Sequence, residues 1–263
     1  MIARQLSLAG QLVTYYSSRP GEPAGIPVIF LHGWRLQAAV WFPLIQSLLA
    51  VSPSNPATNR FAYYALDLPG FGKSAPPART FTLQDYCDVV REFCEKLDLR
   101  GVYLVGHSFG GRVAIKLAAT HSDLVHKLVL ADSAGIRIGQ TRRNILGLIA
   151  KILKPLFRPH SMQHVRHALY WLIGAGDYLA TPELQQTFVR VIEEDLTNYL
   201  PDISCPTLIL WGDRDTETPL SAGQQMAAMI PQATLSVLPC AGHASFLDQP
   251  EKFRDLLLEF ITA

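Results

Sequence analysis

Short apolar runs alternate with longer amphipathic stretches along most of the 263-residue chain. The runs have the length, and the content of β-branched and aromatic residues, that buried strands show. They cover residues 26–32, 60–67, 101–107, 126–132, 206–212 and 233–239. Because strands alternate with helices, we predict an α/β fold with a mostly parallel, doubly wound sheet. The alternating residues 1–16 predict an antiparallel hairpin at one edge of that sheet.

Two of the helical stretches carry start signals. In residues 81–97, Thr82 is the expected N-cap and Asp85 follows three residues later, a variant of the capping box. Residues 250–261 are amphipathic and have Pro250 in the first turn, where a missing backbone N–H is tolerated. We therefore expect a helix over each stretch.

One segment interrupts the alternation. Residues 137–200 show no strand pattern, and the last of their three or four helical patterns has Thr181 as N-cap and Pro182 at the first helical position. We predict a core of residues 1–136 and 201–263 with residues 137–200 as an inserted helical cap. Open α/β sheets bind ligands at the carboxyl edge of their strands, so we interpret the insertion as a lid over that edge. The alternative is a set of extra helices packed on a face of the sheet.

The composition narrows the class of protein. A hydrophobic content of 49% allows a large core, and a net charge of +1 without a basic stripe argues against binding to nucleic acid. No apolar run reaches the roughly 18 residues of a membrane span, and the N-terminus lacks the apolar core of a signal peptide. The four cysteines lack metal-ligand spacing and fit reduced thiols. We expect a soluble, cytoplasmic, globular protein.

A lone serine lies where a predicted strand turns into a predicted helix. The sequence GHSFG at residues 106–110 fits G-x-S-x-G, and this context distinguishes a nucleophile elbow from a chance match. The sharp turn would project the Ser108 hydroxyl above the sheet, and the helix start would point its N–H groups toward any negative charge that develops there. The adjacent His107 is expected to point away into the fold. The plainer interpretation is a glycine-rich turn with an incidental serine.

A serine becomes a nucleophile when a base takes its proton and an acid orients that base. Asp213 and Asp215 follow the strand predicted at residues 206–212, and His243 lies in the loop after the next one. Small residues flank His243 and leave its ring accessible. All these positions are at carboxyl ends of strands, on the same edge as Ser108.

Five motifs, in this order, resemble those of the α/β-hydrolase superfamily, in the group that carries a helical cap. They are FLHGW at 30–34, DLPGFGKS at 67–74, GHSFGG at 106–111, WGDRDTETP at 211–219 and GHASFLDQP at 242–250. The resemblance runs nearly end to end and implies the α/β-hydrolase fold with a triad of Ser108, His243 and Asp215. Asp132, at the other place where members carry the acid, and Asp213 are the alternatives for that acid.

The same resemblance implies an oxyanion hole made of backbone N–H groups, those of Trp34 and of Phe109. His32 is expected to brace the oxyanion loop, and Asp67 to organise its own turn. The implied reaction is acyl transfer to water, which requires no metal and no organic cofactor. Haloalkane dehalogenases and epoxide hydrolases use an aspartate at the nucleophile position, so Ser108 argues against both.

We expect a small-molecule substrate, a carboxylic ester with an apolar acyl or aromatic group. The candidate lining residues of the lid are large and apolar: Phe157, Leu169, Trp171, Leu172 and Phe188. The alternative for each is packing within the lid itself. Alternative functions are a related triad enzyme (C–C bond hydrolase, lactonase, thioesterase, aminopeptidase, perhydrolase or acyltransferase) and a non-catalytic ligand receptor on this scaffold. The sequence identifies neither the natural substrate nor the oligomeric state.

Overall fold

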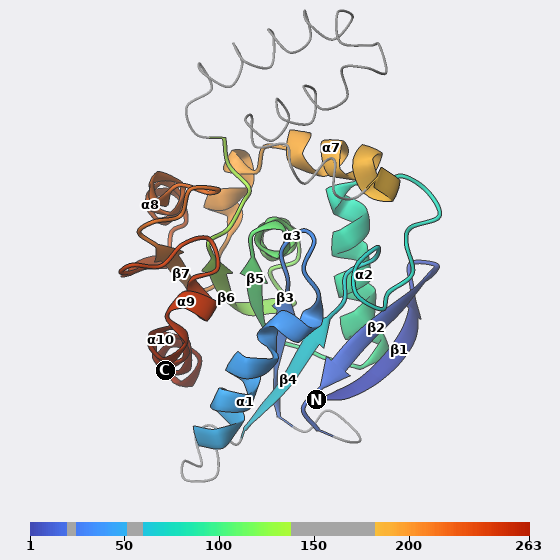
Figure 1. The fold of residues 1–263 in the computed structure, drawn as a ribbon, viewed down its shortest axis with the longest axis horizontal. Helices are drawn as coiled ribbons and strands as arrows, with labels where there is room; N and C mark the ends of the chain where they lie inside the picture. Colours follow the sequence, from blue (N-terminus) through green and yellow to red (C-terminus); the bar gives the residue numbers. More distant parts are fainter. Residues whose placement is uncertain (20–24, 52–59, 138–181) are drawn as a thin grey trace, which may run out of the picture.

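A computed structural model describes residues 1–19, 25–51, 60–137 and 182–263 (Figure 1). Its centre is an eight-stranded sheet in the order β1-β2-β4-β3-β5-β6-β7-β8. The strands are β1 (Ile2–Leu8), β2 (Gln11–Ser17), β3 (Ile26–Leu31), β4 (Phe61–Leu66), β5 (Val102–His107), β6 (Val125–Ala131), β7 (Thr207–Gly212) and β8 (Ala233–Leu238). From β4 to β8 all neighbours are parallel, whereas β1 and β2 form an antiparallel hairpin at the β4 edge. The predicted fold class and the edge hairpin are confirmed.

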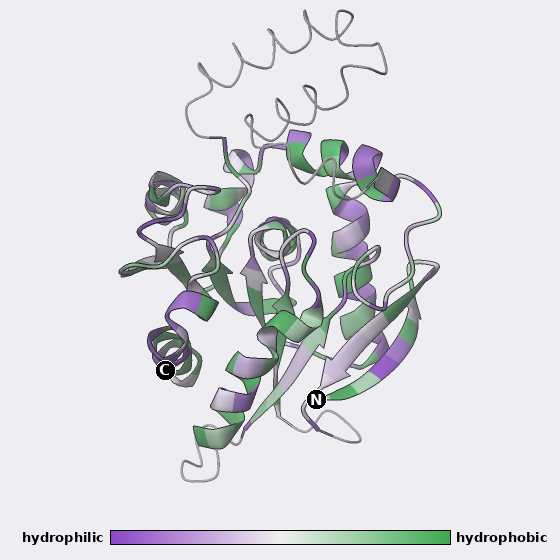
Figure 2. Cartoon of the chain, viewed as in Figure 1, coloured by the Kyte–Doolittle hydropathy of each residue, from purple (hydrophilic) through white to green (hydrophobic). Residues whose placement is uncertain are grey.

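Helices cover both faces of the sheet, as a doubly wound arrangement requires. One face carries α2 (Leu83–Lys96), α3 (Phe109–Thr120) and α8 (Leu220–Met229), and the other carries α1 (Phe42–Val51), α9 (Ser245–Asp248) and α10 (Pro250–Thr262). The strands supply alternate residues to the two faces: Leu128 and Leu130 face the first, and Val129 faces the second. Figure 2 shows hydrophobic and hydrophilic residues together on α1 and α2, as amphipathic helices require.

The predicted helix starts are confirmed. The Thr82 side chain accepts a hydrogen bond from the Asp85 N–H, and the Asp85 carboxylate accepts one from the Thr82 N–H, so the capping box is complete. Pro250 stands in the first turn of α10. None of the helices in the described ranges is long and apolar enough to cross a membrane.

The described part of the predicted cap contains no strand. It consists of η4 (Pro182–Leu184), α7 (Gln185–Glu193) and η5 (Thr197–Asp202). Pro182 opens η4, while its expected N-cap Thr181 lies outside the described residues. The candidate lining residues Phe157, Leu169, Trp171 and Leu172 also lie outside them. The division into a core and a cap therefore stays a prediction.

Candidate active site

Ser108 occupies the turn between β5 and α3 with φ 49° and ψ −110°. Positive φ is rare for residues other than glycine and costs about 1–3 kcal/mol, which the surrounding structure must offset. The strand and the helix lie so close that a Cβ atom on Gly106 would fall 2.5 Å from the carbonyl oxygen of Gly110. The strained turn thus holds the Ser108 hydroxyl at the carboxyl end of a central strand.

The Ser108 hydroxyl begins a chain of hydrogen bonds that links three loops. His243 Nε2 lies 3.0 Å from Ser108 Oγ, and His243 Nδ1 lies 2.9 Å from Asp215 Oδ2. The Asp215 side chain is fully buried, and the His243 side chain is 17% exposed. With Nδ1–H donating to the carboxylate, Nε2 presents its lone pair to the serine hydroxyl. This is the geometry in which a histidine takes a proton from a serine.

The surroundings of Asp215 keep its carboxyl group ionised. Burial alone would raise the pKa of Asp215, but hydrogen bonds from His243 and Thr218 lower it below the ordinary range. Oδ1 accepts the N–H groups of Glu217 and Thr218 at 2.8 and 2.9 Å, and Oδ2 accepts the Thr218 hydroxyl at 2.7 Å. In turn, burial lowers the pKa of His243, but the hydrogen bond and charge of Asp215 raise it above the ordinary value.

The other two candidate acids have different surroundings. Asp132 is fully buried, and its two carboxylate oxygens accept the N–H groups of Gly212 at 2.8 Å and Ser245 at 3.0 Å. Burial, partly offset by these bonds, raises the pKa of Asp132 to about 6. Asp213 is exposed. Of the three aspartates, Asp215 is the one whose carboxylate lies within hydrogen-bonding distance of His243, and Asp132 joins the loops that carry the pair.

His107 has a contact that the sequence did not suggest. Its side chain is buried, but it reaches the carboxyl edge of the sheet, where His107 Nε2 lies 2.7 Å from the carbonyl oxygen of His243. Burial is the main cause that lowers the pKa of His107 to about 3, so the ring is neutral. Because the partner is a carbonyl, Nε2 carries the proton and donates it. His107 therefore fixes the backbone of the residue that faces Ser108.

A second buried histidine braces the loop after β3. His32 Nδ1 donates to the Gly33 carbonyl at 2.8 Å, and His32 Nε2 accepts the Leu68 N–H at 3.0 Å. Asp67 accepts the N–H groups of Ala38 at 2.7 Å and Lys73 at 2.9 Å, which ties its own turn to the same loop. These bonds hold the loop in place beside the elbow.

The two expected oxyanion residues lie on either side of Ser108, one on this loop and one on α3. A Cβ atom on Gly33 would fall 3.3 Å from Ser108 Cβ, so the loop just before Trp34 leaves no room for a side chain between itself and the serine. Phe109 follows the serine directly and begins α3. The indole of Trp34 packs edge-on against Phe109, with ring centroids 5.1 Å apart. Both residues are buried beside the hydroxyl.

The aromatic surroundings extend into the predicted cap. Trp34 also contacts Phe71, with ring centroids 4.8 Å apart, and Phe188 of α7, with centroids 5.0 Å apart. Phe188 is thus brought beside the elbow, as one face of an apolar wall. It is partly buried and packs against the hydrophobic cluster on the face of the sheet that carries α2, α3 and α8.

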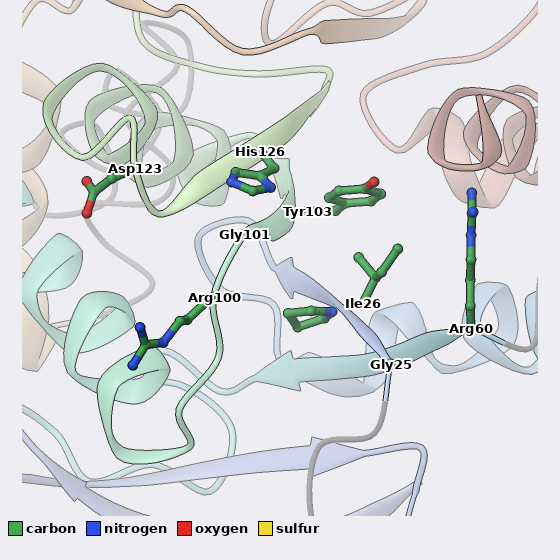
Figure 3. Close-up of a pocket in the computed structure, with 9 residues that line it drawn as sticks. Gly25, Ile26, Arg60, Arg100, Gly101, Tyr103, Asp123 and His126 are labelled. Atoms are coloured by element: carbon green, nitrogen blue, oxygen red, sulfur yellow. The ribbon is translucent and has the colours of Figure 1, made fainter.

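A separate open pocket of about 500 Å³ lies at the opposite edge of the sheet (Figure 3). Its lining includes Ile26, Gly101 and His126, which stand at the amino ends of parallel strands, together with Arg60 and Arg100. The carboxyl edge carries Ser108, so this pocket is not part of the candidate active site.

Comparisons with known proteins identify the family of the chain. A family model described as the alpha/beta hydrolase family matches residues 28–256. A 2-hydroxy-6-oxononadienedioate/2-hydroxy-6-oxononatrienedioate hydrolase of a Pseudomonas species is 28% identical over 214 residues, covering 74% of this chain and 75% of that protein. A pimeloyl-[acyl-carrier protein] methyl ester esterase of Nitrosomonas europaea is 29% identical over 252 residues, covering 87% of this chain and 93% of that protein.

Solved structures share the fold. An esterase from Exiguobacterium antarcticum superposes with a TM-score of 0.75 at 24% identity, covering 100% of both chains. At this identity the likeness speaks for the fold alone.

Proposed function

This chain belongs to the alpha/beta hydrolase family and is a hydrolase, and we propose that it cleaves carboxylic esters. The cleavage would pass through a covalent acyl-serine intermediate. The observation that carries the proposal is the relay of 3.0 Å from Ser108 Oγ to His243 Nε2 and 2.9 Å from His243 Nδ1 to Asp215. A hydroxyl held at a strained elbow and aligned with a base and an acid is equipped for nucleophilic attack on a carbonyl carbon.

In the first half of the reaction, His243 Nε2 takes the Ser108 proton as Oγ bonds to the carbonyl carbon of the ester. The carbonyl oxygen becomes an oxyanion, which the N–H groups of Trp34 and Phe109 stabilise in our proposal. Each such donor is worth roughly 3–4 kcal/mol where charge develops in a water-poor site. The bond from carbon to the leaving oxygen then breaks, and His243 gives its proton to that oxygen.

In the second half, His243 takes a proton from water as the water oxygen bonds to the acyl carbon. The bond between that carbon and Ser108 Oγ breaks, and the proton on Nε2 returns to Oγ. Asp215 accepts the Nδ1–H bond throughout and stabilises the imidazolium in both halves. The carboxylic acid leaves, and the enzyme regains its starting state.

The walls beside the serine favour an apolar acyl or aromatic group. Trp34, Phe71, Phe109 and Phe188 form a continuous set of ring contacts next to the elbow. Such a wall gains free energy from apolar contact and offers few partners to a sugar or a charged acyl group. The relative from Nitrosomonas europaea is named as a methyl ester esterase, which supports ester cleavage as the reaction.

The test combines turnover with labelling. We expect Ser108→Ala to lower kcat for 4-nitrophenyl esters by about 10⁶-fold, because the nucleophile is lost while the fold is kept. A fluorophosphonate probe should label Ser108 in the native chain and nothing in the variant. Ser47→Ala, on the helix α1 away from the elbow, is the matched control and should retain activity and labelling. Labelling of another residue, or turnover by Ser108→Ala near the native rate, would contradict the proposal.

A series of acyl chain lengths tests the substrate class. Hydrolysis that improves from acetate to longer or aromatic acyl groups fits the aromatic wall. A single acylation burst without turnover points instead to an acyltransferase or another related triad enzyme. Binding of the esters without any acylation points to a receptor.

A further inference from the structure

A second carboxylate lies beside the catalytic histidine. Glu217 Oε2 is 3.5 Å from His243 Nε2, the same ring nitrogen that faces Ser108 Oγ at 3.0 Å. Asp215 contacts the other nitrogen, Nδ1, so the two carboxylates lie at opposite sides of the ring. Glu217 is 67% exposed, whereas Asp215 is buried. Glu217 thus presents its charge to solvent and to whatever molecule approaches Nε2.

The position of Glu217 is fixed by the same loop that holds the acid. The Glu217 N–H donates to Asp215 Oδ1 at 2.8 Å, and the next residue, Thr218, bonds to both oxygens of that carboxylate. The backbone of Glu217 therefore cannot move without breaking a bond to Asp215. This anchored backbone keeps the Glu217 carboxylate within reach of His243 Nε2.

Sheet topology separates the two sides of the site. Trp34 follows β3 and Phe71 follows β4, so these two rings of the aromatic wall lie on the β3 side of β5. Glu217 and His243 follow β7 and β8, on the other side of β5. The serine at the end of β5 therefore has an apolar wall on one side and a carboxylate on the other.

In the proposed reaction, the leaving group lies on the side of Ser108 where Glu217 and His243 are found. In the proposed reaction the leaving oxygen takes its proton from His243 Nε2, so it must come within hydrogen-bonding distance of that nitrogen. The remainder of the alcohol then lies near the Glu217 carboxylate. We propose, resting on the ester hydrolysis above, that Glu217 is a specificity-determining residue that favours esters of cationic alcohols over neutral ones of the same shape.

The test uses two butyrate esters that differ by one charge. Butyrylcholine and 3,3-dimethylbutyl butyrate share the acyl group and nearly the shape of the alcohol, and only the first is cationic. The ammonium group also makes choline the better leaving group, so the readout is the change in the kcat/KM ratio on substitution. We expect Glu217→Gln to lower the ratio of butyrylcholine to 3,3-dimethylbutyl butyrate by about two- to fivefold, the upper part of the range for an exposed ion pair. In the native chain, 1 M NaCl should lower the same ratio. Asp213→Asn, an exposed carboxylate in the same loop, is the matched control and should leave the ratio unchanged.

A pH profile supplies a second readout. The charged groups that face His243 are Asp215 and Glu217 after β7 and Asp132 after β6, with neutral His107 behind it on β5. Burial lowers the pKa of His243, but Asp215 first and then Glu217 raise it. Without the Glu217 charge the pKa of His243 is lower, so the unprotonated imidazole persists to lower pH. Glu217→Gln should therefore move the acidic limb of the pH profile of kcat/KM to lower pH. A merely structural role of Glu217 would not shift that limb.

Phosphonylation separates this proposal from the ester hydrolysis on which it rests. Phosphonates with thiocholine or 3,3-dimethylbutanethiol as leaving group form a bond from Ser108 Oγ to phosphorus as the P–S bond breaks, and the serine proton passes through His243 to the thiol. Mass spectrometry of the intact protein measures the rate of phosphonylation by each reagent without any ester turnover.

If the phosphonates react but no ester is hydrolysed, the ester proposal is wrong. The ratio of the two phosphonylation rates then decides on the role of Glu217. Equal charge preference in the native chain and Glu217→Gln, or a lost preference in Asp213→Asn, overturns the role of Glu217. Failure of every reagent overturns both proposals.

Discussion

At the scale of single residues, three aspartates near one histidine differ in what their oxygens contact. Asp215 contacts the His243 ring, Asp132 contacts two backbone N–H groups, and Asp213 is exposed to solvent. A carboxylate that contacts the imidazole sets its tautomer and stabilises its charged form. A carboxylate that contacts only backbone fixes loops instead. The three positions should therefore respond differently to the same substitution.

We predict that Asp215→Asn lowers kcat by about 10⁴-fold with little change in melting temperature, because an amide no longer favours the productive tautomer. Asp132→Asn should instead lower the free energy of unfolding by about 1–3 kcal/mol, since its amide NH₂ would face a backbone N–H. Asp213→Asn should change neither quantity by much. Kinetics and thermal unfolding of the three variants make the comparison. If Asp132→Asn is the variant that loses kcat while staying stable, the acid is Asp132.

The sequence predicted the candidate residues Ser108, His243 and Asp215, but not what holds them. The roles of Thr218 and His107 depend on contacts across the fold, and a single sequence shows no such contacts. The turn left a signal in Asp215 itself, because aspartate side chains commonly accept the backbone N–H group two residues later in a turn. The position of Glu217 beside His243 follows from that same turn. For His107 no local signal exists, since strand β5 and the His243 loop are 136 residues apart.

At the scale of elements, α7 is tied to α3, the helix that begins at the elbow. Arg112, four residues after Ser108, is buried, and its guanidinium donates to the carbonyl of Val191 at 2.6 Å and to that of Glu194. Lys116, one turn further, bonds to the Glu194 carboxylate at 2.7 Å. Together these bonds hold the carboxyl end of α7, the helix that carries Phe188 against Trp34 in the loop after β3.

We predict that Lys116→Met loosens α7 more than the rest of the molecule. The Lys116 side chain is 9% exposed and that of Glu194 is 27% exposed, so the pair is little screened and Glu194 would keep an unpaired charge. Hydrogen bonds to charged groups are worth about 1.5–3 kcal/mol, which corresponds to roughly 10- to 100-fold faster amide exchange in α7. Hydrogen-exchange mass spectrometry measures the amide exchange rates in α7. In addition, KM should rise for esters whose acyl group reaches Phe188.

Lys127→Met is the matched control for this experiment. Lys127 is also a lysine with a single described hydrogen bond, to the Phe260 carbonyl at 2.8 Å, but it lies on β6 and holds α10. Lys127→Met should speed up amide exchange in α10 and leave amide exchange in α7 unchanged. Equal exchange of α7 in the two variants would show that the Lys116 bond does not position that helix.

Strand positions were predictable because their signal is local. Each predicted run of 26–32 through 233–239 overlaps an observed strand. The strands β3, β4 and β7 are buried on both faces, which demands a continuous apolar run, whereas the edge strand β8 is only partly buried. What the alternation could not give is the order of the strands, because pairing depends on contacts between distant segments. The lid interpretation of residues 137–200 depends on such contacts as well. Of that segment, the structure describes α7 and its neighbours, and Phe188 of α7 contacts Trp34 in the loop after β3.

At the scale of the whole molecule, buried ionisable groups link stability to pH. His32 and His107 are buried and neutral, and burial is the main cause that lowers their pKa values to about 4 and about 3. In the unfolded chain both titrate near pH 6.5. Between about pH 6.5 and pH 4 the unfolded state therefore binds up to two more protons than the folded state, so stability falls as pH falls. Asp132 acts in the opposite sense, because its raised pKa of about 6 lets the folded state bind one proton more between about pH 4 and pH 6.

We predict that the free energy of unfolding falls by about 1.4 kcal/mol per pH unit from pH 6 to pH 5, the slope that one net proton gives above the range where the unfolded carboxyl groups titrate. His107→Gln removes one of the two titrating histidines while its amide still donates toward the His243 carbonyl, so the slope should drop to near zero. The exposed His126→Gln is the matched control and should leave the slope unchanged. Urea unfolding at a series of pH values gives the free energy of unfolding of the native chain, His107→Gln and His126→Gln. The slope is the decisive readout, because a variant that is merely less stable shifts every point equally. A native slope in His107→Gln would mean that His107 takes up a proton inside the fold, against its burial and its bond to a carbonyl oxygen.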